Sequence, residues 1–275
     1  MQIVDKEVIA KYQGQKIVKL KVEAAEIAQK AKPGQFVVVM VSDVGERTPL
    51  TIVEADKEKG FITLIVQEAG LTTKLLAKLK TGDSLYALSG PLGHPTKIKK
   101  YGKVILVAGG VGIAEIYPVA KAFKEAGNYV ITILGAKNKD LLILEDKLKE
   151  VSDESYVTTD DGSKGKKGFV TDALRLLLSK EGADLVYAVG PIIMMEKVSK
   201  LTLSQKINTL VSLNALMVDA TGMCGCCRVT VSGKVKFTCV DGPEFEAHNI
   251  DWQELAMRNS MYESSEKHIC KLKKL

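Results

Sequence analysis

Apolar and polar residues alternate along most of the first hundred positions of the chain. The alternation is clearest in four short segments, each bounded by glycine, aspartate or proline: IVKLKVEA, QFVVVMVSD, LTIVEAD and GFITLIVQEA, at residues 17–24, 35–43, 50–56 and 60–69. Successive side chains of a strand point to opposite faces of its sheet, so this period of two is typical of half-buried strands. The pattern predicts an antiparallel sheet or small β-barrel.

A different pattern begins after residues 89–95, which read SGPLGHP. Continuous apolar runs predict buried strands at 103–110, 128–136 and 184–190, and residues 155–161 are expected to be extended. Amphipathic periodicity predicts helices at 113–127, 141–151 and 170–182. Strands that alternate with helices of this length indicate an α/β domain whose parallel sheet is covered on both faces.

These changes of pattern divide the sequence into four predicted segments. Residues 1–97 form the antiparallel β-barrel, and residues 98–213 form the α/β domain. Residues 214–248 contain the cysteine-rich loops, and residues 249–275 form a short basic tail.

Composition indicates an ordinary globular protein of 275 residues, 46% of them hydrophobic. The apolar runs are interrupted by glycine or proline and are shorter than the roughly 20 residues of a membrane span, so no membrane segment is expected. The first residues lack the features of a secretion signal, and we therefore expect a cytoplasmic protein. The net charge of +6 comes from scattered lysines, which favour a solvated surface over a nucleic-acid interface.

A glycine-rich turn, GGVGIA, directly follows the predicted strand 103–110 and opens the predicted helix. Glycines there allow the backbone to approach a pyrophosphate, and the free amides of the helix start stabilise its charge. The candidate nucleotide-binding residues are Gly109, Gly110, Gly112, Ile113 and Ala114. The alternative is a tight strand-to-helix turn with no ligand, and the absence of a following GK[ST] excludes a P-loop.

Two segments of the predicted barrel carry candidate anion-binding groups. In ERTPLTI, Arg47 can grip a diphosphate, and Thr51 follows the turn formed by Pro49 and Leu50. In EAGLTTKLLAKL, Gly70, Thr72 and Thr73 stand at the start of a helix, where backbone amides are free. The alternatives are a surface arginine and an ordinary helix cap.

Four of the five cysteines lie between residues 224 and 239, a density that favours a metal centre in a reducing compartment over disulfides. Plant-type 2Fe–2S sites use the spacing C-x4-C-x2-C followed by a distant cysteine. DATGMCGCC keeps this spacing with aspartate in the first position, and a carboxylate is an accepted, harder ligand for iron. The predicted ligands are Asp219, Cys224, Cys227 and Cys239.

Three alternatives to this ligand set remain. The same residues can bind structural zinc. Cys226 can replace Asp219 as the fourth ligand, although adjacent cysteines have difficulty in directing both sulfurs at one iron. The cysteines can also be buried thiols without metal, which a glycine-rich loop disfavours.

Together these segments resemble the ferredoxin reductase family, whose barrel binds FAD and whose α/β domain binds a nicotinamide nucleotide. The resemblance rests on residues 47–51, 70–73, the GGVGIA loop and VGPIIMME at 189–196, and it covers most of the chain. It implies that Gly190, Pro191 and Met194 lie beside the nicotinamide. It also implies FAD contacts for the arginine, threonine and glycine residues of the first domain.

A narrower resemblance is to the electron-transfer subunits of dihydroorotate dehydrogenase. It is carried by GPLGHP at 90–95, TTDDGSKGKKGFVTD at 158–172, the cysteine loop and CVDGPEF at 239–245. Within that branch, PLTI, SLNALMVDATGMCG and DGPEF are most similar to small subunits of NADH-dependent reduced ferredoxin:NADP oxidoreductases. Such subunits carry FAD and 2Fe–2S, bind NAD(H), and pair with a larger FAD and iron–sulfur subunit in an electron-bifurcating heterodimer that reaches ferredoxin indirectly.

The resemblance implies an oxidoreductase in which NADH gives a hydride to FAD and single electrons pass on through 2Fe–2S to a partner. Asp160 and Asp161, at a predicted strand end, favour NAD over NADP if they lie near the ribose, whereas Lys164 and Lys166 favour the reverse. A dihydroorotate dehydrogenase electron-transfer subunit is the nearest alternative. An alternative of another class is a nucleotide-binding regulatory protein with a zinc knuckle.

Overall fold

The computed structural model describes residues 1–272, without the side chains of residues 266, 267 and 270–272. It divides into two compact units. The first comprises Met1–His94, Ala215–Pro243 and the chain from Asp251, and the second comprises Pro95–Asn214 and Glu244–Ile250. These units do not coincide with the four predicted segments, because residues 244–250 return to the unit of the α/β domain. The last residues of the predicted tail, 273–275, lie outside the described residues.

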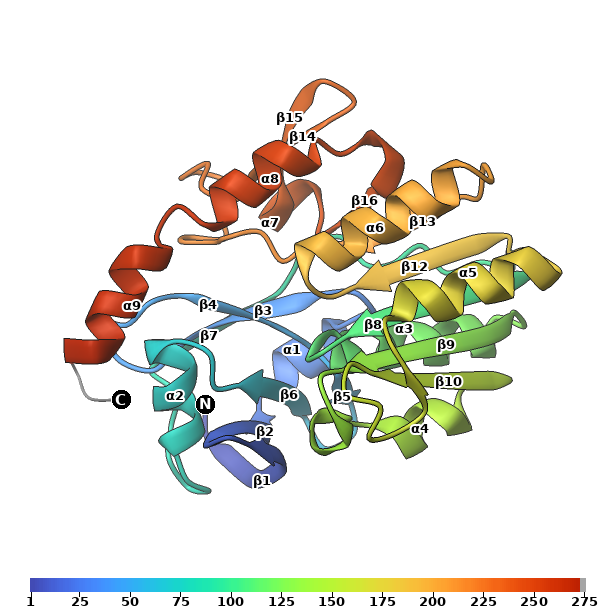
Figure 1. Ribbon diagram of the computed structural model, residues 1–275. Coiled ribbons are helices and arrows are strands. Elements are labelled where there is room, and N and C mark those ends of the chain that lie inside the picture. The colour runs from blue at the N-terminus through green and yellow to red at the C-terminus, as the bar shows by residue number, and fades with distance from the viewer. Residues whose placement is uncertain (273–275) are drawn as a thin grey trace. The chain divides into compact units, whose positions relative to one another are not determined.

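Two antiparallel sheets form the barrel of the first unit (Figure 1). The four-stranded sheet has the order β1-β2-β6-β5, with β1 at Ile3–Tyr12, β2 at Gln15–Glu23, β6 at Phe61–Gln67 and β5 at Glu54–Asp56. The three-stranded sheet has the order β4-β3-β7, with β4 at Thr48–Thr51, β3 at Phe36–Met40 and β7 at Ala87–Leu92. Two helices, α1 (Ala25–Lys30) and α2 (Leu71–Lys78), connect the strands. Fully buried residues of both sheets, among them Leu20, Val37 and Leu64, form one apolar core.

The predicted strand 50–56 is two strands that belong to different sheets. β4 pairs with β3, whereas β5 pairs with β6. Between them the backbone amide of Ile52 donates to Gln35 and that of Val53 donates to Thr63, so the chain changes sheets at this corner. Both side chains are buried, so two adjacent apolar residues mark the corner and shift the alternation by one position.

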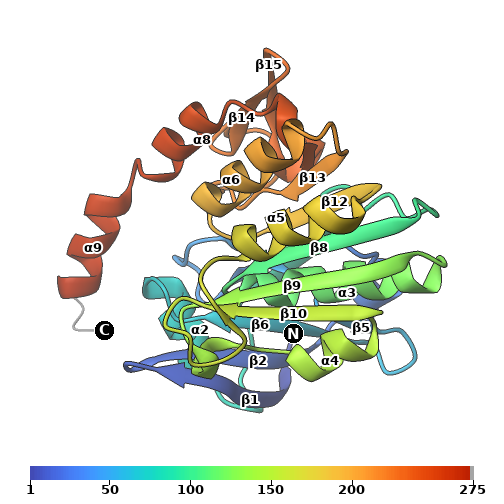
Figure 2. The ribbon, with the colours of Figure 1, turned by 45° about the vertical axis from the view of Figure 1, so that its right-hand side comes forward.

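The second unit contains a seven-stranded sheet of order β11-β10-β9-β8-β12-β13-β16. Its parallel strands are β8 (Lys103–Gly109), β9 (Tyr129–Ala136), β10 (Glu154–Thr159), β11 (Lys166–Lys167), β12 (Leu185–Val189) and β13 (Thr209–Ser212). Strand β16 (Glu244–Glu246) is antiparallel to β13. Helices α3 (Gly112–Glu125) and α4 (Glu145–Glu150) pack together, as do α5 (Val170–Glu181) and α6 (Ile192–Leu203), so that helices cover both faces (Figure 2).

The predicted helix 141–151 is shorter than its apolar pattern indicates. A 3-10 turn at Lys139–Leu141 precedes it, and α4 begins only at Glu145 because Leu144 adopts a left-handed conformation with φ of 53°. A left-handed residue cannot continue a right-handed helix.

The region after residue 214 is more regular than the expected loops and basic tail. It contains the hairpin β14 (Arg228–Val231) and β15 (Lys234–Phe237), the short helix α7 (Thr238–Asp241), and the helices α8 (Trp252–Asn259) and α9 (Glu263–Leu272). A 3-10 turn, η2, spans Ala247–Asn249. Leu255 is the buried residue of α8, so this helix has a narrow apolar face that its polar composition conceals. No helix in the described part of the chain is long and apolar enough to cross a membrane.

Candidate redox sites

The cysteine loop brings two predicted ligands into contact. Cys227 and Cys239 are each 2% exposed, and their Sγ atoms lie 3.3 Å apart. Cys239 is the second residue of α7, and Cys227 directly precedes β14. The Thr238 amide donates to the Cys227 carbonyl at 3.0 Å. The hairpin of β14 and β15 therefore brings the chain back beside Cys227, so that the two sulfurs are in contact. Cys224 is exposed and Cys226 is half-buried in the same loop.

Backbone amides surround the sulfurs of this loop. The amide of Cys226 donates to Cys224 Sγ at 3.5 Å, and that of Cys239 donates to Cys227 Sγ at 3.4 Å. A backbone hydrogen bond from Gly222 lowers the pKa of Cys239 against the larger opposing effect of burial. Amide donors stabilise thiolates, the form in which cysteine binds metal. This arrangement of donors fits an iron–sulfur cluster.

Glycines 222 and 225 are required by the backbone of the loop. Their φ angles are +83° and +66°, and a Cβ atom on Gly222 would lie 3.0 Å from Val240. A residue with a side chain would be strained at either position. The tight turns of the loop beside Cys224, Cys226 and Cys227 therefore depend on these two glycines.

In the cofactor-free chain, Cys239 is a protonated thiol. Burial, followed by its hydrogen bond with Cys227, raises the pKa of Cys239 to about 12. Iron binds the thiolate, so cluster assembly must release this proton. The buried hydroxyl of the neighbouring Thr238 has no hydrogen-bond partner among the described residues, and it is a spare donor beside the ligand pair.

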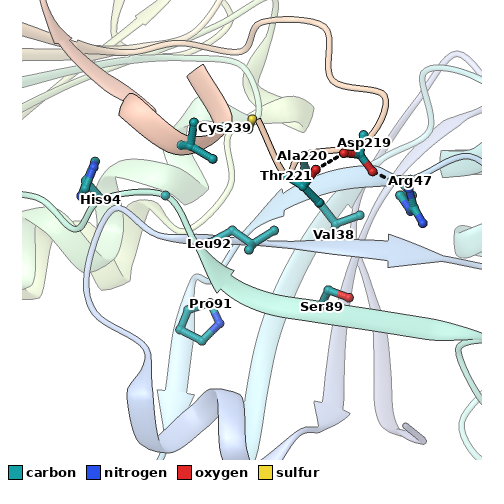
Figure 3. Close-up of a pocket in the computed structure, with 12 residues that line it drawn as sticks. Val38, Arg47, Ser89, Pro91, Leu92, His94, Asp219, Ala220, Thr221 and Cys239 are labelled. Atoms are coloured by element: carbon teal, nitrogen blue, oxygen red, sulfur yellow. Dashed lines mark hydrogen bonds and ion pairs between the residues drawn. The ribbon is translucent and has the colours of Figure 1, made fainter. Parts of the chain in front are cut away.

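Asp219 is already engaged within the protein. Its Oδ1 accepts from Arg47 Nη1 at 2.6 Å, and its Oδ2 accepts from the hydroxyl of Thr221 (Figure 3). The side chains of Arg47 and Asp219 are 48% and 22% exposed. Both line a cavity of about 460 Å³, together with Ser89, His94 and Cys239. The sequence predicts a diphosphate as the partner of Arg47 and gives no role to Thr221.

The backbone of Cys226 is hydrogen-bonded to helix α8. Its carbonyl accepts from Arg258 Nη2 of α8 at 3.0 Å. Burial and the neighbouring Cys224 raise the pKa of the Cys226 thiol. Among the described residues, no group of three or more histidine, cysteine or acidic side chains is arranged to hold a single metal ion.

The first of the two predicted flavin-binding segments lies on β4 and just before it. Pro49, Leu50 and Thr51 are half-buried and pair with Val38, Val37 and Phe36 of β3. Residue Arg47 directly precedes this strand. The strand therefore fixes the backbone of these residues while it leaves each of them partly accessible.

At the start of α2, both predicted threonine hydroxyls have partners. Thr73 Oγ1 accepts from the amide of Gly70 at 3.0 Å, which is the capping role that the sequence left open. Thr72 Oγ1 donates to Glu46 Oε2 at 2.5 Å, so a carboxylate stands at the predicted anion site. Nothing lies within 4 Å of the position of a Cβ atom on Gly70. This open surface fits the close approach of a phosphate to the backbone.

The nucleotide loop meets the segment GPIIMM at the ends of neighbouring parallel strands, β8 and β12. A Cβ atom on Gly112 would lie 2.7 Å from the Val189 carbonyl, and one on Gly109 would lie 2.6 Å from Met194 Sδ. Gly110 has φ of +60° and open space around it. Ligands bind at the carboxyl ends of strands in such sheets, so the loop fits a pyrophosphate.

The remaining predicted residues of the nucleotide segments contribute in different ways. Ile113 and Ala114 are 0% and 2% exposed, so their side chains belong to the core, and their amides donate to the carbonyls of Gly110 and Val111. Gly190 and Pro191 begin the turn into α6, and a Cβ atom on Gly190 would lie 3.1 Å from Gly109. The two loops are thus in contact along their backbones.

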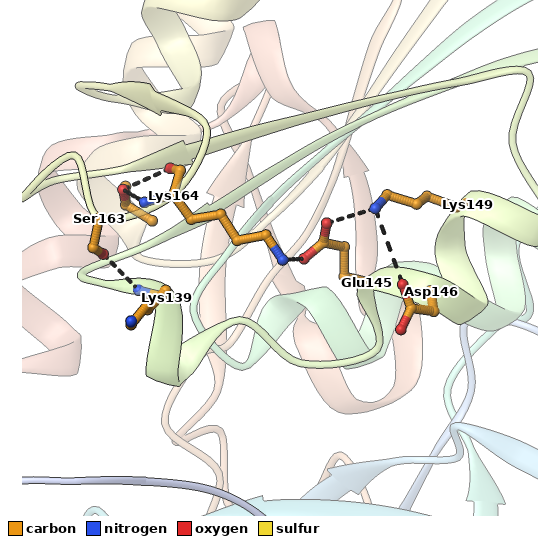
Figure 4. A network of polar contacts seen from close by, with 7 residues as sticks. Lys139, Glu145, Asp146, Lys149, Ser163 and Lys164 are labelled. Atoms are coloured by element: carbon orange, nitrogen blue, oxygen red, sulfur yellow. Dashed lines mark hydrogen bonds and ion pairs between the residues drawn. The ribbon is translucent and has the colours of Figure 1, made fainter.

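A network of charges follows β10, where the specificity residues were predicted (Figure 4). Ser163 donates to Asp161 through its amide and hydroxyl, at 2.9 and 2.6 Å, and these bonds lower the pKa of Asp161. Glu145 accepts from Lys164 at 2.6 Å and Lys149 at 2.7 Å. Burial would raise the pKa of Glu145, but these two lysines lower it. Asp160 is exposed, and Lys164 is already paired.

Comparisons with known proteins match three segments of the chain to cofactor-binding domains. Residues 1–96 match the oxidoreductase FAD-binding domain, and residues 106–200 match the oxidoreductase NAD-binding domain. Residues 214–251 match the iron–sulfur cluster binding domain of dihydroorotate dehydrogenase B. A Thermotoga maritima protein named as a homologue of the dihydroorotate dehydrogenase B (NAD(+)) electron transfer subunit is 49% identical over 246 residues, which cover 90% of this chain and 87% of that protein.

The chain belongs to the family of dihydroorotate dehydrogenase B electron-transfer subunits and their homologues. A solved chain from a study of electron bifurcation by the NADH-dependent reduced ferredoxin-NADP oxidoreductase is 47% identical, with a TM-score of 0.90 over 97% of this chain and 95% of that one. An Amycolatopsis cytochrome P450 reductase, 21% identical with a TM-score of 0.63 over 75% of this chain and 65% of that one, shares the fold. The predicted fold class is confirmed, and the matches to FAD-binding, NAD-binding and iron–sulfur domains confirm the predicted cofactors.

Proposed function

We propose that the chain is the small, electron-transferring subunit of an NADH-dependent reduced ferredoxin:NADP oxidoreductase. Its larger partner would carry further FAD and iron–sulfur centres, and the complex would bifurcate electrons and act on ferredoxin through that partner. The observation that supports this most directly is the 47% identity over nearly the whole chain to a protein from a structural study of such a complex. Dihydroorotate dehydrogenase electron-transfer subunits share the cofactor domains and differ in partner, so they are the second candidate.

The residues have distinct proposed roles. Gly109, Gly110 and Gly112, in the turn that Ile113 and Ala114 continue, would hold the pyrophosphate of NAD(H). Gly190, Pro191 and Met194 would border the nicotinamide. Pro49, Leu50 and Thr51 of β4, and Gly70, Thr72 and Thr73 of α2, would hold FAD. Bound FAD converts the two-electron chemistry of a hydride into one-electron transfer. No acid or base of the chain is required for that step.

Asp219, Cys224, Cys227 and Cys239 are proposed to ligate the 2Fe–2S cluster. The amide donors of residues 222, 226 and 239 support the three cysteines. The position of Asp219 beside the same cavity as Cys239 supports the carboxylate. Cys226 is left as a spare thiol whose carbonyl is fixed by Arg258.

Co-purification tests the proposed complex. A tagged copy of this chain, produced in its own host, should retain a large flavin and iron–sulfur subunit, and the complex should reduce ferredoxin at the expense of NADPH only when NAD⁺ is present. Retention of a dihydroorotate-oxidising subunit would instead support the second candidate. A chain that purifies with zinc and without flavin would contradict both.

A further inference from the structure

The contact between Arg47 and Asp219 links the barrel to the cysteine loop over 172 positions of sequence. The separation of 2.6 Å between Nη1 and Oδ1 is that of a short charge-assisted hydrogen bond. Arg47 directly precedes β4, whose pairing with β3 fixes the backbone from Thr48 onward. Arg47 is the last residue of the loop before this strand, so the sheet fixes its backbone on one side.

The carboxylate of Asp219 has a partner on each oxygen, and the two partners differ in strength. Arg47 carries a full charge, whereas Thr221 offers a hydroxyl from two residues away. Both bonds involve the ionised carboxylate, but only Arg47 adds the attraction of an opposite charge, so the hydroxyl is the partner that is more easily displaced. A carboxylate that binds iron through one oxygen can keep the arginine on the other.

Arg47 is also the one lysine or arginine among the twelve described residues that line the shared cavity. Cys239, a second predicted ligand, lines the same cavity (Figure 3). A hydrogen bond from a cation to a cluster ligand draws negative charge off that ligand, and this favours the reduced state of the cluster, which is the more negative one. The hydrogen bond from Arg47 would therefore influence the reduction potential of the cluster through Asp219.

We propose that Arg47 is a positioning residue of the iron–sulfur centre, which holds the Asp219 carboxylate and raises the reduction potential of the cluster, instead of the diphosphate-binding residue that the sequence suggested. The proposal rests on the proposed function, since it requires Asp219 to be a ligand. It assigns the binding of the FAD diphosphate to groups other than Arg47.

The test measures two quantities in the holoprotein: the midpoint potential of the cluster, by a redox titration followed by electron paramagnetic resonance, and the FAD content per chain. Arg47→Gln should shift the ratio of oxidised to reduced cluster about tenfold toward the oxidised state at a fixed ambient potential, which corresponds to a lowering of about 59 mV. FAD content should remain near that of the wild type. Arg175→Gln, on the exposed face of α5, is the matched control and should change neither quantity.

A double-mutant comparison tests whether the effect passes through Asp219. In an Asp219→Cys background, Arg47→Gln should shift the ratio much less, since the carboxylate partner is absent. An equal shift in both backgrounds, or loss of FAD with an unchanged potential, overturns the proposal. If Arg47→Gln fails to retain the cluster, Arg47→Lys is titrated instead: a smaller shift in the same direction supports the proposal, and an unchanged potential overturns it. Failure of the proposed function is distinct, because the wild-type chain would then show no 2Fe–2S signal.

Discussion

The sulfurs of Cys227 and Cys239 lie 3.3 Å apart in a buried position, although a hairpin of eleven residues separates them in the sequence. Neither thiol is accessible enough to serve as a surface group. Their neighbour Cys226 is adjacent in sequence but has a different environment, with its carbonyl bonded to α8. This difference allows the ligand set to be tested one cysteine at a time.

Cys227→Ser should abolish the 2Fe–2S absorption, whereas Cys226→Ser should retain it. The buried pair supplies two ligands, and loss of one leaves the site incomplete. Both changes remove a thiol from the same loop and differ little in volume, so each controls for the other. Visible absorption with iron and sulfide analysis provides the measurement. Loss of the cluster in Cys226→Ser, with retention in Asp219→Ala, would make Cys226 the fourth ligand.

Gly70→Ala should fold as well as the wild type and bind FAD less tightly. The backbone at Gly70 has φ of −121°, and no atom lies within 4 Å of the added methyl group, so the free chain has room for it. A phosphate bound close to this backbone would clash with the methyl group. Thermal unfolding of the apoprotein and titration with FAD separate the two effects. FAD affinity equal to that of the wild type would remove Gly70 from the site.

Gly112→Ala should behave in the opposite manner and destabilise the second unit before any nucleotide binds. The added methyl group would lie 2.7 Å from the Val189 carbonyl, and such overpacking costs about 1–3 kcal/mol. The thermal midpoint of the nucleotide-free protein is the measurement. An unchanged midpoint together with lost NADH binding would show that Gly112 serves the ligand alone.

The wild-type chain should prefer NADH to NADPH, and Glu145→Gln should reduce that preference. Glu145 pairs with Lys164 and Lys149, and removal of its charge would free both lysines to attract a 2'-phosphate. Exposed charges contribute up to about 1 kcal/mol, so a change of about two- to fivefold in the affinity ratio is expected. Glu150→Gln is the control on the same helix. An unchanged ratio of the two affinities would show that the ribose does not bind near Glu145 and its two lysines.

Ionisation of Glu244 should destabilise the second unit as pH rises. Burial raises the pKa of Glu244 above 4.5, although hydrogen bonds from Thr96 and Tyr187 oppose the effect. Because the unfolded chain then releases the proton at lower pH than the folded chain, stability falls from about pH 4.5 up to the folded pKa. Tyr187 also has its pKa raised by burial, so it remains neutral over this range.

Glu244→Gln retains the acceptor oxygen and removes this loss of stability. Its advantage over the wild type in thermal midpoint should therefore grow between pH 4.5 and 8. A parallel pH dependence in the two proteins would contradict the assignment. Glu246→Gln, on the same strand and exposed, is the control.

Local patterns were sufficient to predict the strand and helix types of both domains. The switch from alternating to continuous apolar segments reflects one sheet with an exposed face and another covered on both faces, and that distinction needs no long-range information. The spacing from Asp219 to Cys227 likewise depends only on neighbouring residues. These features were therefore predictable.

Pairings between distant segments were not predictable from these patterns. The corner at Ile52 and Val53 shifts the alternation by one position, but that shift does not show that β4 and β5 pair with different strands. The partner of Arg47 is 172 residues away, and nothing in ERTPLTI distinguishes an arginine that serves a diphosphate from one that serves a carboxylate. Thr221 differs, because it lies only two residues from Asp219 and its bond to that carboxylate is a local contact.

The account depends most on the claim that this chain passes electrons from NADH through FAD to a 2Fe–2S cluster. Anaerobic addition of NADH to the purified chain, followed by visible absorption and electron paramagnetic resonance with metal analysis, tests it most directly. The account predicts flavin and ferric–sulfide absorption, equal amounts of iron and labile sulfide, and a reduced-cluster signal that appears after NADH. A colourless protein that contains zinc and gives no signal would contradict it.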